Sequence, residues 1–177
     1  MNLKSRVLLG DSQNATHLAF YLLIGALVGS LLGVLDQATA SVWRPAGGEL
    51  KTLLEASDLS GLTIGILYGG LAEEIILRWG LLSLIALGFS KFLNRRVAIQ
   101  LAIFLSAALF AAGHLPALFL VSPDPAGVVL VRTLAINLIA GIIFGYAYAR
   151  TSLEAAFSAH MGFHIGVFLV ATLLLSS

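Results

Sequence analysis

Long apolar runs separated by short polar segments make up nearly the whole chain. The runs cover residues 15–35, 59–89, 97–115, 128–149 and 155–175. A helix needs about 20 predominantly apolar residues to cross a hydrocarbon core of about 30 Å, and each run is of this order or longer. The pattern therefore predicts an all-α fold, a polytopic transmembrane bundle of about five membrane-crossing helices.

The composition agrees with this pattern and reduces the number of possible classes of function. Of the 177 residues, 59% are hydrophobic and 11% charged, and the mean hydropathy is +0.98, whereas soluble domains are about 45–50% apolar and about 25% charged. We expect a single transmembrane domain over residues 1–177. The net charge of +1 gives no reason to expect a nucleic-acid partner, and the lack of cysteine excludes disulfides, thiolate metal ligands and a thiol nucleophile.

Two of the runs have features of their own. The first run is too long for the core of a signal peptide, so we interpret it as a retained span. Its glycines lie four residues apart and predict close helix packing: Gly25, Gly29 and Gly33. The run over residues 59–89 exceeds the usual length of about 17–25 residues, so it is expected to tilt, kink or break. Gly69-Gly70 and Gly80 are the expected places.

The polar segments predict loops and an orientation. Residues 36–58 are predicted to form a polar loop, with a short interfacial helix over residues 49–59. Six of the ten Lys and Arg residues fall on the side of the N-terminus, the 91–96 loop and Arg150, and two fall on the opposite side. By the positive-inside rule, the N-terminus is expected to be cytoplasmic. Dividing the 59–89 run into two crossings would reverse the orientation of all later segments.

Ionisable side chains inside the apolar runs mark the candidate functional residues, because a charge at the centre of a span costs about 2.5–3.5 kcal/mol. Away from the loops these are Glu73, Glu74, Arg78, His114, Arg132, His160 and His164. Arg132 lies about one turn inside its span, and His17 lies near the start of the first. Both are expected to reach the membrane surface and are left out of the predicted site.

The spacing of the charged residues suggests different roles for Glu73 and Glu74. On a helix, Glu74 and Arg78 are four residues apart, so they share a face and can pair. Glu73 is turned away from that face by about 100°. One carboxylate is therefore expected to be structural and the other to be free for chemistry.

The histidines suggest convergence on one place. His114 follows Phe110 by four residues, so the two rings share a helix face, and His160 and His164 are also four apart. A lone histidine in an apolar helix more often makes an interhelical hydrogen bond than binds a ligand. A histidine pair, however, can converge on one ion, water or substrate group. Acid and imidazole groups on three separate spans predict one shared functional site.

These motifs, in this order on successive spans, resemble the CAAX-protease and bacteriocin-processing family of intramembrane proteases, often called Abi. The resemblance rests on Glu73-Glu74-x-x-x-Arg78, on Phe110-x-x-x-His114, and on His160 followed by a polar residue four positions later. It covers about residues 60–170, with 15–35 as an extra N-terminal span. Residues 141–160 also resemble the glycine- and aromatic-rich approach to the family's last motif.

The chain departs from the family pattern in two places. Leu77-Arg78-Trp79-Gly80 stands where the family usually has Phe-Arg-Gly, a change expected to affect packing rather than chemistry. His164 stands where the family usually has Asn. An Asn amide donates hydrogen bonds but ordinarily does not bind zinc, whereas His can do either, so this position is open to an oxyanion donor, an extra metal ligand or altered activity.

The resemblance implies an endopeptidase in the plasma membrane of a prokaryote, acting on a membrane-associated peptide or lipidated protein. Some relatives remove the terminal tripeptide of prenylated proteins, and others cleave bacteriocin leaders or serve self-immunity. By the same resemblance Glu73 would activate water and His114 would orient or share its proton. His160 and, more distantly, His164 would stabilise the oxyanion, and Glu74, grouped with these catalytic residues, would pair with Arg78 and hold the helix.

Metal dependence and two other functions stay open at this point. Glu73, His114 and His160 suit a catalytic zinc ion that keeps one position for water, and the same groups can activate water without a metal. Arg78 and Phe110 are expected to support them from behind. A proton or cation transporter subunit would use the same ionisable groups, and a non-enzymatic immunity protein would bind a peptide without cleaving it. Substrate identity, prenylation and oligomeric state leave no mark on the sequence.

The depth of the predicted residues conflicts with straight, upright helices. At 1.5 Å per residue, His114 would lie about 25 Å from the cytoplasmic side and His160 about 10 Å from it. A shared site therefore requires strongly tilted helices, a 150–154 connection set deep in a water-filled cavity, or different span boundaries.

Overall fold

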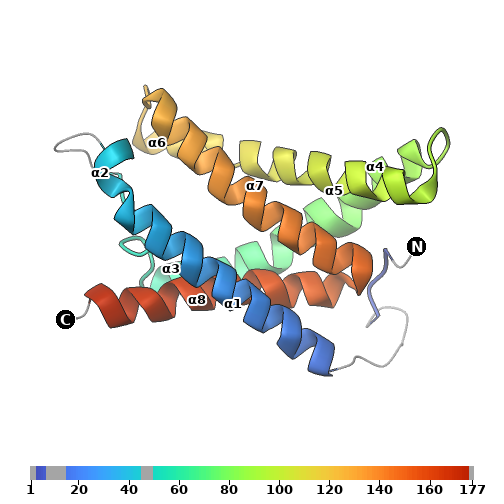
Figure 1. The fold of residues 1–177 in the computed structure, drawn as a ribbon, viewed down its shortest axis with the longest axis horizontal. Coiled ribbons are helices and arrows are strands. Elements are labelled where there is room, and N and C mark those ends of the chain that lie inside the picture. The colour runs from blue at the N-terminus through green and yellow to red at the C-terminus, as the bar shows by residue number, and fades with distance from the viewer. Residues whose placement is uncertain (1–2, 7–14, 45–49, 176–177) are drawn as a thin grey trace.

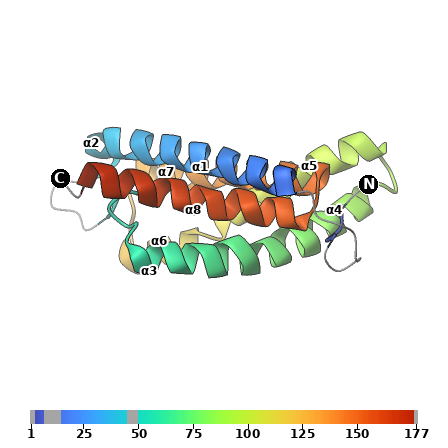
Figure 2. The same ribbon diagram turned by 90° about the horizontal axis from the view of Figure 1, so that it is seen from below.

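The computed structural model describes residues 3–6, 15–44 and 50–175. The regular elements of this part of the chain are all helical, which confirms the predicted all-α fold (Figure 1). In chain order they are α1 (Ala15–Ala38), α2 (Ala40–Trp43), α3 (Leu59–Ile64), η1 (Gly65–Glu73), η2 (Ile75–Leu82), α4 (Ser83–Phe89), α5 (Arg95–Ala112), α6 (Leu115–Val121), α7 (Gly127–Arg150) and α8 (Leu153–Leu175). Helix α8 packs against α1, α7 and η1 (Figure 2).

Four helical segments are long and apolar enough to cross a membrane: Ala15–Ala38, Arg95–Val121, Gly127–Arg150 and Leu153–Leu175. Large apolar side chains on them remain exposed, for example Leu27, Phe104 and Leu173. Long helices that are apolar on both their buried and exposed faces are typical of membrane spans. The chain is therefore an integral membrane protein.

The remaining predicted span, over residues 59–89 and second along the chain, is helical from Leu59 to Phe89 but irregular. It consists of α3, η1, η2 and α4 in succession, and η1 and η2 are π-helices joined through Glu74, whose backbone is in the right-handed helical region. Gly69-Gly70 and Gly80 lie within these π-helical segments. The irregularity predicted at these glycines is present as π-helical geometry rather than as a break. Such geometry occurs often at functional sites.

The glycines of α1 allow its backbone to touch that of α8. A Cβ atom on Gly25 would lie 1.9 Å from the carbonyl oxygen of Ala159, and one on Gly29 would lie 2.1 Å from that of Phe163. Helix α8 carries matching glycines, because a Cβ on Gly162 would meet the backbone of α1 at 2.1 Å. The close packing predicted from the glycine stripe is thus confirmed.

Replacing Gly29 with alanine is expected to lower the free energy of unfolding by about 3 kcal/mol, the upper end for an overpacked position, because the clash involves backbone rather than a movable side chain. Unfolding in detergent, followed by circular dichroism, measures the change. Gly88→Ala is the matched control, since a Cβ there meets no atom within 4 Å. Equal stability of the two variants would contradict the close crossing of α1 and α8.

The segment between the first two spans differs from its prediction. Helix α1 continues to Ala38 and α2 follows it, so the predicted loop over residues 36–58 begins too early. The predicted interfacial helix over 49–59 is wrong: residues 53–56 form a turn, the rest of 50–58 is not helical, and residue 49 lies outside the described ranges. One cause is a contact with a distant segment and the other is local, because the Leu53 N–H donates to Asp36 of α1 and the Thr52 N–H donates to nearby Glu55. Side-chain acceptors thus take the amide groups that a helix would use.

The end of the third span helps to explain how His114 and His160 reach the same depth in the bundle. Helix α5 ends at Ala112, and α6 begins at Leu115 with Pro116 in its first turn, where proline loses no helical hydrogen bond. The helical path therefore extends beyond the predicted end at residue 115 and places His114 at the joint. Figures 1 and 2 also show the α4–α5 turn extending farther along the molecule than the α7–α8 turn. His114 and His160 can thus lie at one level despite their different distances along their helices.

Candidate functional site

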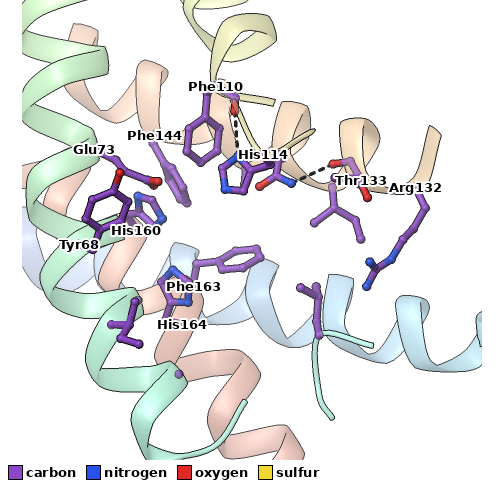
Figure 3. A pocket seen from close by; sticks show the side chains of 18 residues that line it. Tyr68, Glu73, Phe110, His114, Arg132, Thr133, Phe144, His160, Phe163 and His164 are labelled. Carbon is purple, nitrogen blue, oxygen red and sulfur yellow. Dashed lines mark hydrogen bonds between the residues drawn. The ribbon is translucent and has the colours of Figure 1, made fainter. Parts of the chain in front are cut away.

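A cavity of about 320 Å³ lies inside the bundle, lined by residues of α3, η1, α5, α7 and α8 and by the α5–α6 joint. Four of the predicted catalytic residues line it together: Glu73, His114, His160 and His164. Figure 3 shows them around one space, with Arg132 at the end far from Glu73. The folding of the chain thus brings residues from three separate spans to one cavity.

Glu74 lies behind this cavity. Its carboxylate is fully buried and accepts a hydrogen bond from Arg78 Nε at 3.0 Å and one from His160 Nδ1 at 3.0 Å. The predicted pairing of Glu74 with Arg78 is present. Glu74 was placed among the catalytic residues, but it is not one of the cavity-lining side chains and reaches the cavity only through His160.

Arg78 and Phe110 form a chain of contacts from Glu74 to His114 and His160. The Arg78 side chain is fully buried, with Nη1 3.5 Å from Ser106 Oγ and its guanidinium carbon 5.2 Å from the centre of the Phe110 ring. The Phe110 ring meets His114 edge-on at 4.7 Å and His160 edge-on at 5.9 Å between ring centres. Arg78 thus lies behind the cavity, whereas Phe110 lines it; the supporting roles expected for the two residues stay a prediction.

Hydrogen bonds fix the same tautomer of two histidines. His114 Nδ1 lies 2.9 Å from the carbonyl oxygen of Phe110, and His160 Nδ1 lies 3.0 Å from Glu74. A backbone carbonyl is an acceptor only, and so is the Glu74 carboxylate in its ion pair with Arg78, so each Nδ1 carries a proton. In the neutral ring Nε2 then has a free lone pair, which can accept a proton or bind a metal. Each ring can donate to an oxyanion through Nε2 only after it has gained a proton.

Two glycines of η1 make room for the histidine pair. A Cβ on Gly65 would lie 2.4 Å from His164 Nδ1, and one on Gly69 would lie 3.0 Å from His160 Nε2 and 3.1 Å from His164 Nε2. The two imidazoles are stacked with 5.2 Å between ring centres. The close approach of η1 to α8 thus needs glycine at positions 65 and 69, and the Nε2 atoms of both rings lie beside Gly69.

Glu73 is the carboxylate available to the cavity. Its side chain is half-buried and makes no hydrogen bond or ion pair with any residue that the structure describes. The Glu73 side chain lines the cavity inside the bundle and also an adjoining cleft, and His114 and Tyr68 line both spaces. Tyr68 was missed by the sequence analysis because an aromatic residue in an apolar span carries no signal of its own.

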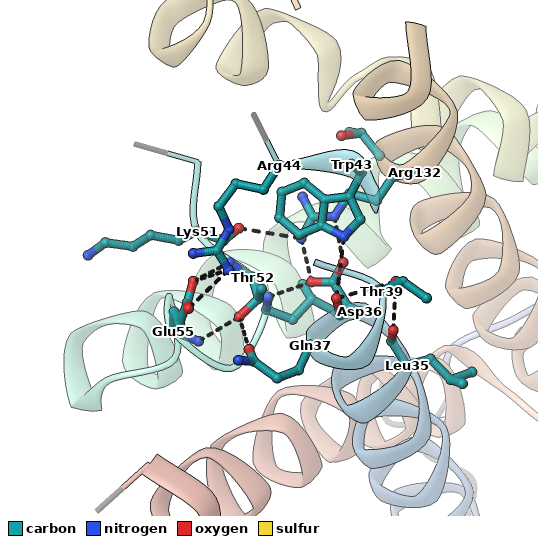
Figure 4. A network of polar contacts seen from close by, with 12 residues as sticks. Leu35, Asp36, Gln37, Thr39, Trp43, Arg44, Lys51, Thr52, Glu55 and Arg132 are labelled. Atoms are coloured by element: carbon teal, nitrogen blue, oxygen red, sulfur yellow. Dashed lines mark hydrogen bonds and ion pairs between the residues drawn. The ribbon is translucent and has the colours of Figure 1, made fainter. Parts of the chain in front are cut away.

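Arg132, which is left out of the predicted site, lies at the cavity. It lines the far end of the cavity, and its Nε and Nη2 donate to the two oxygens of the buried Asp36 at 2.7 and 2.5 Å. Its guanidinium also lies 4.3 Å from the ring centre of Trp43 (Figure 4). Asp36 had been assigned to a loop, so the pairing of opposite charges on α1 and α7 was not considered, although it was the available signal.

The same network contains a second, more exposed ion pair. Arg44 Nη2 lies 3.0 Å from Glu55, and the Thr52 backbone N–H donates to the same carboxylate at 2.9 Å. The hydrogen bond from Thr52, together with Arg44, holds the pKa of Glu55 below its ordinary value. These contacts join residues 50–58 to the end of α1 (Figure 4).

Asp36→Asn is expected to lower the free energy of unfolding by about 3 kcal/mol, since it leaves Arg132 without its counter-charge in a mostly buried place. The side chains of Arg132 and Asp36 are 18% and 1% exposed. Glu55→Gln serves as control, because the Arg44 and Glu55 side chains are 27% and 29% exposed and such pairs contribute about 1 kcal/mol at most. Denaturation in detergent compares the two variants, and losses of equal size would refute the structural role of Asp36.

The described part of the chain holds no group of three or more His, Asp or Glu side chains placed to bind a metal ion. The predicted zinc ligands Glu73, His114 and His160 share the cavity but are not assembled as a coordination site. The two Nε2 lone pairs are suitable donors, but the donor set is incomplete. Metal dependence stays a prediction, and no chemical step is derived through a metal below.

The fold and the cavity define a class: a polytopic helical membrane protein with carboxylate and imidazole groups gathered inside the bundle. A family model described as type II CAAX prenyl endopeptidase Rce1-like matches residues 55–166, well over half of the chain. The chain belongs to this family of proteases, which confirms the resemblance in its motifs. The match includes all the cavity-lining acid and imidazole residues and leaves α1 outside. No curated protein and no solved structure matches the chain.

Proposed function

We propose that this protein is an intramembrane endopeptidase that hydrolyses a peptide bond of a membrane-associated substrate with water activated by Glu73 and the histidines. One observation carries the proposal: the Glu73 carboxylate, which has no partner among the described residues, lines the same cavity as two imidazoles whose Nδ1 protons are held by Phe110 and Glu74. Membership of a protease family supports the reaction class.

In the first step Glu73 takes a proton from water as the water attacks the carbonyl carbon of the scissile bond. His114 accepts a hydrogen bond from the same water through Nε2, because its Nδ1–H is engaged by Phe110. A carboxylate and an imidazole positioned in this way remove the need for free hydroxide. The product of the step is a tetrahedral intermediate with a negative oxygen.

In the second step Glu73 gives the proton to the leaving nitrogen, and the carbon–nitrogen bond breaks as the oxyanion becomes a carbonyl again. His160 suits the stabilisation of the oxyanion once it is protonated, because Glu74 compensates its charge through Nδ1. His164, stacked on His160, adds a second imidazole on the same side of the cavity. The role of Glu74 is to orient His160 rather than to touch the substrate.

The surroundings of the site favour a substrate that approaches from the lipid. Ile64 and Tyr68 line the cavity and are 63% and 60% exposed, so its mouth lies at the molecular surface. The adjoining cleft, which shares Glu73 and His114, has the exposed apolar side chains Ile76 and Leu109 on its walls. An apolar or lipidated peptide can therefore reach Glu73 without crossing a polar surface.

Cleavage of a lipidated peptide by the purified chain tests this proposal. A fluorescent peptide that ends in a farnesylated CAAX sequence is expected to lose its terminal tripeptide, as seen by mass spectrometry, and the unprenylated peptide is expected to react more slowly. Binding of the peptide without cleavage would support a non-enzymatic binding protein instead. Proton or cation flux in liposomes, without proteolysis, would support a transporter.

Metal dependence is tested separately on the same preparation. Elemental analysis of the purified protein, followed by chelation and add-back of zinc, relates metal content to turnover. Turnover that survives chelation would support activation of water by Glu73 and the histidines without a metal. Loss of turnover on chelation, with recovery on adding zinc, would show that the ligands assemble only with the metal.

A further inference from the structure

An open cleft of about 880 Å³ lies between the start of α5 and the end of α7, away from the candidate active site. Three arginines line it, namely Arg95, Arg96 and Arg150. Its other walls include Ile99 and Ile103. The start of α5 and the end of α7 lie at the same end of the molecule, beside the α4–α5 turn (Figure 1).

The charges in this cleft favour an anion. No carboxylate is among the side chains that line it, and Arg95 and Arg96 make no ion pair with any residue in the described ranges. Arg150 is held in place, because its Nη2 donates to the hydroxyl of Tyr146 at 2.6 Å and its guanidinium lies 4.9 Å from the centre of that ring. Three like charges repel one another in a shared space, and a bound anion removes that repulsion.

Phosphate is the anion that matches these donors. Guanidinium groups bind phosphate oxygens with paired N–H donors, which a lysine cannot do with the same geometry. The positive end of α5 also points to this region, since Arg95 is its first residue and Arg96 its second. Helix terminus and arginines therefore act on the same ligand group.

The apolar walls indicate that the phosphate carries a hydrocarbon chain. Ile99 and Ile103 are four residues apart on α5, so they follow Arg95 along one face of the helix, toward the interior of the span. Tyr146 is 47% exposed beside Arg150, the placement of an aromatic residue at headgroup level. A free phosphate ion would gain nothing from an isoleucine wall, whereas a phospholipid uses both parts.

We propose that this cleft is a binding site for an anionic phospholipid. Its phosphate is held by Arg95, Arg96 and Arg150, and the beginning of an acyl chain lies against Ile99 and Ile103. Basic pockets between transmembrane helices at the membrane surface bind such headgroups. The site is independent of the proposed proteolysis, because it shares no lining residue with the cavity that contains Glu73.

The test is lipid binding to the delipidated full-length chain in detergent. Short-chain phosphatidylglycerol, short-chain phosphatidylcholine and sodium phosphate are titrated separately, and bound lipid is counted by native mass spectrometry. We expect one phosphatidylglycerol to be retained at concentrations where phosphatidylcholine is not. Arg95→Gln and Arg150→Gln are each expected to weaken it about five-fold, the effect typical of one basic side chain at an anionic surface.

Lys91→Gln is the matched control. Lys91 lies in the turn between α4 and α5, close in sequence to Arg95, is exposed and does not line the cleft. It is expected to leave phosphatidylglycerol binding unchanged. An equal loss in Lys91→Gln would reduce the effect to general surface charge and overturn the proposal. Equally tight binding of sodium phosphate would overturn the lipid assignment, as would equal retention of phosphatidylcholine. Circular dichroism confirms that the variants remain folded.

Discussion

Glu73→Gln is expected to lower turnover of the membrane-bound peptide by a factor of about 10³, the usual size of a lost general base. Glutamine keeps the shape of the side chain but cannot take a proton from water. Because the Glu73 carboxylate makes no bond with the described part of the chain, the free energy of unfolding should change by less than about 0.5 kcal/mol. Single-turnover cleavage and thermal denaturation of the same preparation measure both quantities.

The outcome separates catalysis from folding. His114→Ala should also lose turnover, because His114 lines the same two spaces as Glu73. Full activity of the Glu73→Gln protein would end the proposed mechanism. A low activity together with a large loss of stability would show that Glu73 supports the fold, and that the water is activated elsewhere.

Glu74→Gln is expected to give the opposite result, a loss of about 3–5 kcal/mol in the free energy of unfolding. Removing one partner of a buried ion pair leaves the other charge without compensation. Here that charge is Arg78, whose side chain is 0% exposed, and the hydrogen bond that orients His160 is weakened as well. Denaturation in detergent compares this variant with Glu73→Gln.

Two neighbouring glutamates thus provide matched controls for each other. The same isosteric change, one position apart, is expected to remove turnover at residue 73 and stability at residue 74. A Glu74→Gln protein as stable as the parent would contradict the buried network of Glu74, Arg78 and His160. Equal effects at the two positions would contradict the division of roles between them.

The sequence predicted the long helices well because membrane spans leave a simple signal. A continuous apolar run must satisfy its own backbone hydrogen bonds, so its length and boundaries define a helix. The pairing of Glu74 with Arg78 and the turning of Glu73 toward the cavity also followed from spacing, since one position of offset turns a side chain to another helix face. On η1 and η2 the chain is π-helical, yet Glu74 and Arg78 still pair.

What could not be predicted depended on contacts between distant segments. The turn over residues 53–56 follows from Asp36, which takes the Leu53 N–H that a local helix would have used. From its position near the end of a span, Arg132 was expected to reach the membrane surface. Its burial at the cavity depends on the same residue, Asp36, on another span. The position of Glu74 behind His160 needed the approach of α8 to the π-helical run.

Helix α1 lies outside the residues that match the family, yet the matched region is incomplete without it. A protein trimmed to residues 55–166 would carry Arg132 with no counter-ion and would present the glycine face of α8 to lipid where a neighbouring backbone now fits. Minimal versions made for crystallisation or engineering should therefore begin before α1, because the matched region takes from α1 both the counter-ion of Arg132 and the close backbone contact of α8.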